Sequence, residues 1–130
     1  DAKAAVERDH VHLVYTAGGP DDPAVKQLRV AAGDHVAKVN DEIGAALGRI
    51  LAQLVNQSGL DRAVVSGGDT SGHVCSALGI DALTAAAPTI PGAAICNAHG
   101  GTRPLTLALK GGQMGSRDYF GWVLNGGGHR

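Results

Sequence analysis

The chain has 130 residues, which is enough for one domain with a single hydrophobic core. Its 11 Lys and Arg nearly balance its 12 Asp and Glu, and a formal net charge of −1 gives no basic surface for nucleic acid or an anionic membrane. One Trp, two Tyr and one Phe leave few platforms for stacking bases. We therefore expect neither nucleic acid nor a membrane among its partners.

The cysteine pattern and the N-terminal sequence bear on location. Cys75 and Cys96 form no CxxC pair, and the sequence carries no signal segment and no apolar run of membrane-spanning length. These features favour two reduced thiols in the cytoplasm, with a disulfide as an unsupported alternative. Because residue 1 is Asp and not Met, we expect a piece of a longer protein in which residues 1–9 resemble a linker.

The first predicted elements are a strand and a short helix. Residues 11–17 are rich in β-branched and aromatic side chains and stop at Gly18-Gly19-Pro20, which predicts a strand. Asp21-Asp22-Pro23 then predicts the start of a helix over residues 24–32. We interpret the two carboxylates as a solvated helix cap and not as metal ligands.

The longest periodic segment covers residues 36–57. Its apolar residues recur at steps of three and four, which predicts one face of an amphipathic helix that ends at Gly59. Gly44 and Gly48 lie four residues apart within it. We interpret this spacing as close packing of the helix against a sheet.

Short apolar strands and helices alternate through the rest of the chain. The predicted elements are strands over residues 63–65, 80–84, 93–96 and 105–109, helices over residues 73–78 and 119–124, a polar loop over residues 97–103 and a frayed end over residues 126–130. This alternation predicts a single layered α/β domain, with a mainly parallel sheet, flanking helices and room for an antiparallel member near residues 93–109.

Two glycine-rich turns, each between a strand and a helix, carry the candidate site. They span residues 66–72 and 110–116, and neither matches a P-loop or a GxGxxG motif. If their strands are neighbours, both turns face one crevice, where helix N-termini and a lysine suit a polyphosphate. The candidate nucleotide-binding residues are Gly67, Gly68, Asp69, Thr70, Ser71, Lys110, Gly111 and Gly112.

Several of these residues have a structural alternative. Thr70 or Ser71 can cap the following helix. Asp69 either approaches the phosphates through Mg²⁺ or only caps the helix, and Lys110 either neutralises phosphate or is an exposed lysine at a strand end. His73 and His99 are nearby candidate bases for which a structural role is favoured. No metal cluster and no catalytic residue is predicted from the spacing.

The blocks SGGDTSG (66–72), ALGI (77–80), IPG (90–92), LALKGGQMG (107–115) and DYF (118–120) resemble the C-terminal nucleotide-binding domain of the four-carbon acid sugar kinases. That family was formerly grouped with domains of unknown function and Hrp-dependent type III effectors. The resemblance extends from about residue 36 onward and lies in the order and spacing of the blocks.

The resemblance implies an ATP-dependent kinase that acts on threonate, erythronate or a 3-oxo-tetronate. In such an enzyme a separate N-terminal domain binds the sugar acid and carries the catalytic base, so this chain would bind ATP or ADP with Mg²⁺ without turnover. It also implies that Gly67, Gly68, Asp69, Thr70 and Gly112 contact ATP. The alternative is an interaction module of effector type with purely structural glycine turns. Apolar faces that a missing domain would cover favour association between copies of the chain.

Overall fold

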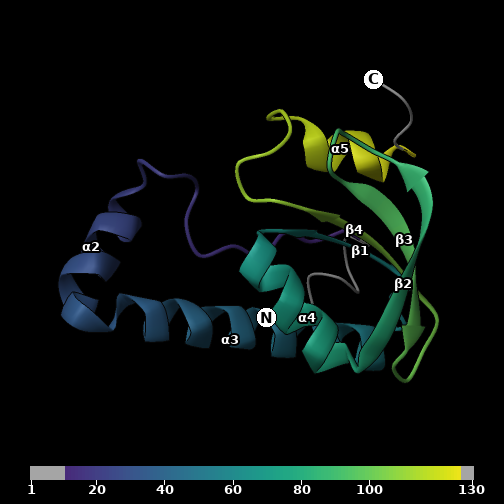
Figure 1. The fold of residues 1–130 in the computed structure, drawn as a ribbon, viewed down its shortest axis with the longest axis horizontal. Helices are drawn as coiled ribbons and strands as arrows, with labels where there is room; N and C mark the ends of the chain where they lie inside the picture. Colours follow the sequence, from purple (N-terminus) through teal and green to yellow (C-terminus); the bar gives the residue numbers. More distant parts are fainter. Residues whose placement is uncertain (1–10, 127–130) are drawn as a thin grey trace.

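The computed structural model describes residues 11–126, which form a four-stranded sheet with helices packed against it (Figure 1). In chain order the elements are α2 (Pro23–Ala32), the 3-10 helix η1 (Gly33–His35), α3 (Val36–Ser58), β1 (Arg62–Ser66), α4 (Gly68–Leu78), β2 (Ile80–Pro88), β3 (Ala94–Gly100), β4 (Leu105–Lys110) and α5 (Tyr119–Leu124). Helix α4 packs against both α3 and the sheet, and α3 extends well beyond the sheet toward α2.

The strand order is β1-β4-β3-β2. Strand β1 pairs with β4 in parallel, whereas β4 with β3 and β3 with β2 are antiparallel. The α/β prediction is therefore confirmed, including the antiparallel member near residues 93–109, but the mainly parallel sheet is matched only in part. Short connections join β2 to β3 and β3 to β4, and a connection of that length reverses the chain instead of crossing over.

The core lies where β4 meets the helices. Leu107 of β4 is fully buried, and Leu105 beside it is nearly so. They pack in one cluster with Val55 of α3, Val65 of β1 and Val74 of α4. Burial of such apolar side chains is the main stabilising term in folding, so β4 joins the sheet and both long helices into one unit.

The N-terminal helices agree with the sequence prediction. Helix α2 begins after Asp22, whose Oδ1 accepts a hydrogen bond from Ala24 N at 2.9 Å, so the expected cap is confirmed. Helix α3 ends before Gly59, which adopts a left-handed conformation with φ of 67°. Among residues 11–126, no helix combines the length and the apolar character that a membrane crossing requires.

The strand predicted over residues 11–17 is wrong. This segment carries no strand pairing, and the side chains of Val11, Leu13, Val14 and Tyr15 are 39–65% exposed. Strand composition reflects fit to a pleated, half-buried surface, and this segment has no such neighbour in the described structure. The linker over residues 1–9 and the frayed end beyond residue 126 lie outside the described residues.

Three boundaries also differ from the prediction. Helix α4 begins at Gly68 and not at residue 73, so most of the first glycine-rich turn is helical. Strand β2 continues to Pro88 and β3 continues to Gly100, because Ala87 pairs with Ile95 and Ile80 pairs with Gly100. Long antiparallel pairing thus extends both strands into segments whose composition predicts turns and loops.

Gly44 and Gly48 of α3 pack against helix α4, not against the sheet as predicted. A Cβ atom at Gly44 would overlap the ring of His73, and one at Gly48 would lie 2.8 Å from the His73 carbonyl oxygen and 3.2 Å from the Ala77 Cβ. The close contact between the two helices therefore depends on the missing side chains. The four-residue spacing predicted a close approach correctly but not the element that approaches.

This contact generates the first prediction. Gly48→Ala introduces a methyl group against backbone that cannot move away, and we expect it to lower the free energy of unfolding by about 1–3 kcal/mol. Gly121→Ala is the matched control, because a Cβ there meets nothing within 4 Å and alanine favours the helix. Urea denaturation of both variants measures the difference. Equal stability of the two would show that the helix contact is not tight.

Candidate functional site

The two glycine-rich turns meet at one edge of the sheet. Ser66 and Lys110 are register partners at the ends of the parallel strands β1 and β4. Directly after them, Gly67 N donates to Lys110 O at 2.9 Å. A Cβ atom at Gly112 would lie only 3.8 Å from Gly67 Cα. The two turns are therefore neighbours at this edge, as the parallel pairing of their strands requires.

Gly67 makes the sharp passage from β1 into α4. Its φ of 118° and ψ of 127° lie in a region that side chains rarely allow, and a Cβ atom there would meet Thr70 Oγ1 at 3.1 Å. Ser71 donates both its N–H and its hydroxyl to Gly67 O, at 2.9 and 2.7 Å. Thr70 and Ser71 thus lie inside the helix, and the prediction that one of them caps it is wrong.

The N-terminus of α4 has no capping side chain among the residues described. The first N–H groups of a helix lack partners within the helix and carry the positive end of its dipole. Gly68 is exposed, and a Cβ atom there would meet nothing within 4 Å. Open space therefore lies beside Gly68 at the uncapped end of α4, where a phosphate group could approach the helix.

Lys110 lies beneath the second turn. Its side chain is only 8% exposed, and Nζ donates to Gly111 O at 2.9 Å and to Gly112 O at 3.3 Å. The ammonium also lies 5.6 Å from the centroid of the Tyr119 ring, in a cation–π contact. The interpretation as an exposed lysine at a strand end is therefore wrong. In this structure its charge holds the carbonyl groups of the turn.

Asp69 is exposed in the first turn of α4, where a carboxylate interacts favourably with the helix dipole. It also lines a groove of about 640 Å³ between α3 and α4. The other polar residues of the groove are Asn40 and Asp41 from α3 and His73 and Ser76 from α4. Sequence reasoning missed Asn40 and Asp41, because their distance from the glycine-rich turns along the chain gives no local signal.

The two candidate bases have different surroundings. His73 Nε2 lies 2.9 Å from Asp41 Oδ1, and this contact links α4 to α3 at the groove. His99 Nε2 lies 2.7 Å from Thr84 Oγ1, across the pair β3–β2. Both rings are thus hydrogen-bonded parts of the fold, as favoured from sequence.

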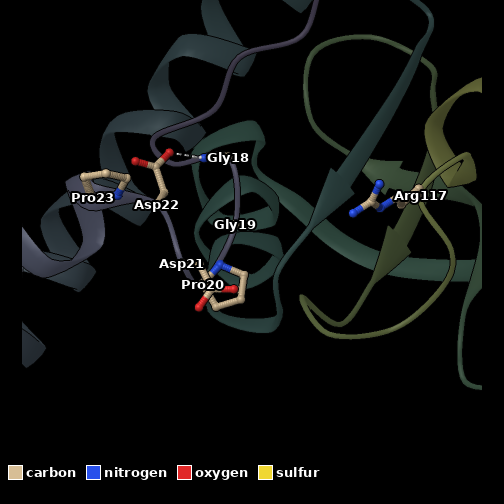
Figure 2. Close-up of a pocket in the computed structure, with 7 residues that line it drawn as sticks. All are labelled: Gly18, Gly19, Pro20, Asp21, Asp22, Pro23 and Arg117. Carbon is tan, nitrogen blue, oxygen red and sulfur yellow. Dashed lines mark hydrogen bonds between the residues drawn. The ribbon is translucent and has the colours of Figure 1, made fainter.

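A second hollow of about 590 Å³ lies between the loop over residues 18–23 and Arg117 (Figure 2). Gly18 N donates to Asp22 Oδ2 at 2.6 Å, which holds this loop closed. The N–H groups of Gly18 and Ala24 lower the pKa of the Asp22 carboxyl, because they stabilise its charged form. Asp22 is therefore committed to its helix cap, and Arg117 is the cationic side chain that lines this hollow.

Two further observations limit the chemistry. Burial, and secondarily the neighbouring Cys96, raises the pKa of the Cys75 thiol, so its thiolate is disfavoured. Both cysteines are free. In the part of the chain that is described, no three His, Cys, Asp or Glu side chains gather to hold a metal ion. The site offers backbone donors and scattered carboxylates, which suit a phosphate ligand that brings its own cation.

Comparisons with known proteins identify the family to which the chain is similar. Residues 1–120 match the family model described as a nucleotide-binding C-terminal domain. The chain is 40% identical to a 3-oxo-isoapionate kinase of Paraburkholderia graminis, over 96% of this chain and 28% of that protein. It is also 40% identical to a 3-oxo-tetronate kinase of Pseudomonas savastanoi pv. phaseolicola, over 86% of this chain and 25% of that protein.

Solved structures show the same fold. A Bordetella bronchiseptica protein with a domain of unknown function, crystallised with citrate as a domain-swapped dimer, matches with a TM-score of 0.61 and 26% identity. The match covers 64% of this chain and 21% of that one. The chain spans about a quarter of the length of the two kinases. It belongs to the family of nucleotide-binding C-terminal domains, as its resemblance to the C-terminal domain of the four-carbon acid sugar kinases implies.

Proposed function

We propose that the chain is the ATP-binding domain of a kinase that phosphorylates four-carbon acid sugars, namely threonate, erythronate or a 3-oxo-tetronate. The observation that carries this proposal is the meeting of the two glycine-rich turns beside the uncapped end of α4. Backbone N–H groups at a helix N-terminus bind phosphate without needing a charged side chain. The family and the relatives named as kinases support the same conclusion.

The proposed contacts follow from the positions of the predicted residues. We call this proposed site the phosphate cradle. Gly67, Gly68 and Gly112 let the phosphates approach the backbone there, and the backbone N–H groups of Asp69 and Thr70 donate hydrogen bonds to them. Ser71 supports it by holding the Gly67 carbonyl, and Lys110 supports it through the carbonyls of Gly111 and Gly112. Most groups of the cradle therefore belong to the backbone. Because backbone groups carry no net charge, the cradle itself does little to neutralise a triphosphate.

Mg²⁺ is the cation that fits this arrangement. It binds through oxygen ligands, retains several waters and usually bridges one or two carboxylates to substrate phosphates. Asp69 is exposed beside the cradle, so it can accept hydrogen bonds from waters of a metal ion that arrives with the nucleotide. When bound, the ion would neutralise charge that develops on the phosphates during transfer.

The rest of the proposed enzyme lies outside this chain. Phosphoryl transfer needs a group that orients or deprotonates the sugar hydroxyl, and both candidate histidines are engaged with neighbouring side chains. We propose that a sugar-acid domain of the parent protein supplies this group and the substrate pocket. A supply of ATP and two free thiols fit the cytoplasm as its location.

One observation favours a second candidate function, that of an interaction module. Val11, Leu13 and Tyr15 expose large apolar side chains, and such surface is typical of a contact with another chain or domain. The domain-swapped dimer of the Bordetella protein supports association between copies. A module of this kind would bind a partner without any effect of nucleotide on its melting temperature.

Nucleotide binding distinguishes the two candidates. With ATP and Mg²⁺ at a hundred times the dissociation constant, we expect the native state to gain about 2.7 kcal/mol, because the ligand binds only folded protein. Gly68→Val should abolish this gain, since the new side chain occupies the open approach to the α4 N-terminus. Gly121→Val is the matched control. Thermal melting measures the change in melting temperature that ATP and Mg²⁺ cause in all three proteins. A wild-type melting temperature that does not change would contradict nucleotide binding.

The isolated chain should bind ATP without turning it over. When 3-oxo-tetronate is added to the 130-residue chain with ATP and Mg²⁺, we expect no release of ADP above the rate without the sugar acid. A coupled ADP assay measures this rate. Release of ADP that depends on the sugar acid would show that the chain holds its own base and substrate pocket.

Lys110 generates a further prediction. Lys110→Met keeps the stem but removes the ammonium that holds two carbonyl groups, each in a charge-assisted bond worth about 1.5–3 kcal/mol. We expect a comparable loss in the free energy of unfolding and about a tenfold weaker affinity for ATP, because the second turn loses its support. Lys38→Met, at an exposed lysine of α3, is the control. Unchanged stability of Lys110→Met would refute the supporting role.

A further inference from the structure

We propose that the groove between α3 and α4 binds the ribose hydroxyls of the nucleotide, with Asp41 and Asn40 as the groups that contact them. The inference rests on the proposed function and adds to it the position of the sugar. It also makes the N-terminal half of α3 part of the binding site. None of the sequence motifs includes this part of the helix.

The groove is continuous with the phosphate cradle. Gly68 and Asp69 line one end of it and also begin α4, where the backbone N–H groups are uncapped. From there the groove runs along α4 past His73, with Asn40 and Asp41 on the facing helix. If the phosphates of a nucleotide bind at the N-terminus of α4, the ribose attached to them therefore lies beside α3.

The chemistry of the groove suits hydroxyl groups and not further phosphates. A carboxylate accepts hydrogen bonds from hydroxyls but repels a phosphate, whereas the α4 N-terminus does the reverse. Asn40 can both donate and accept. Ala37 is the one apolar side chain of the lining, and its one aromatic ring, that of His73, packs at Gly44 and contacts Asp41, so the groove offers a base little surface for stacking.

Asp41 is held ready for this contact. Its Oδ1 lies 2.9 Å from His73 Nε2, and the second carboxylate oxygen has no protein partner among residues 11–126. The His73 ring is fixed in turn, because it occupies the space that a side chain at Gly44 would fill. The contact orients one oxygen of the carboxylate, while the side chain as a whole is 73% exposed and therefore accessible to a ligand from solvent.

The test compares three ligands by titration calorimetry in the presence of Mg²⁺: ATP, 2′,3′-dideoxyATP and inorganic tripolyphosphate. We expect the wild-type chain to bind ATP about tenfold more tightly than the dideoxy nucleotide, because the dideoxy nucleotide cannot donate a hydrogen bond to the Asp41 carboxylate. Asp41→Ala should lower the affinity for ATP by the same factor and leave the affinities for the other two ligands unchanged.

Two variants complete the design. Asn40→Ala leaves the contact between Asp41 and His73 intact and should lower the affinity for ATP alone. The test therefore does not depend on whether the Asp41→Ala variant folds. Glu42→Gln is the control, since this residue lies next to Asp41 but faces Lys38 and does not line the groove. It should change none of the three affinities.

Equal binding of ATP and the dideoxy nucleotide by the wild-type chain would overturn the inference and leave the phosphate site standing. The inference is also overturned if Asp41→Ala lowers the affinity for tripolyphosphate as much as it lowers the affinity for ATP. If a folded wild-type chain binds none of the three ligands, the proposed function fails, and the inference fails with it.

Discussion

The site depends on the parallel pairing of β1 with β4. Because parallel strands end at the same edge of a sheet, the turns that follow them are neighbours, although about 45 residues separate them in the chain. The bond from Gly67 N to Lys110 O locks the two ends together one residue beyond the ladder. The rest of the sheet is antiparallel and contributes by burying β4 on its other side. A single parallel pair is thus sufficient to bring the two glycine-rich turns together at one edge of the sheet.

The second constraint is the close contact between α3 and α4. Gly44 and Gly48 let the helices touch, and the His73 ring fills the space at the crossing. On the N-terminal side of this contact the helices border the open groove that Asn40 and Asp41 line. The same two glycines therefore shape both the helix contact and the surface next to the proposed phosphate cradle.

Local patterns predicted the elements whose structure is local. The spacing of apolar residues is enough to identify α3, and the segment of α5 was predicted with the bounds that the structure has. Residues 11–17 have strand composition, but composition does not name the partner that a strand requires. The start of α4 was placed too late because Asp, Thr and Ser favour caps, whereas here a glycine with positive φ ends the turn earlier. The neighbouring turns could be inferred, but not the burial of Lys110 or the contact between Asp41 and His73, which join distant segments.

The position of Lys110 has a consequence for how a ligand arrives. Its ammonium is nearly buried and is bonded to carbonyl groups of its own turn, so it is not presented at the surface for direct contact with an incoming ligand. With a formal net charge of −1 and carboxylates at Asp41 and Asp69, the chain offers an incoming anion no long-range attraction. Encounter would then proceed by unassisted diffusion, at a rate that varies little with ionic strength, and the cradle would act only over the last few ångströms.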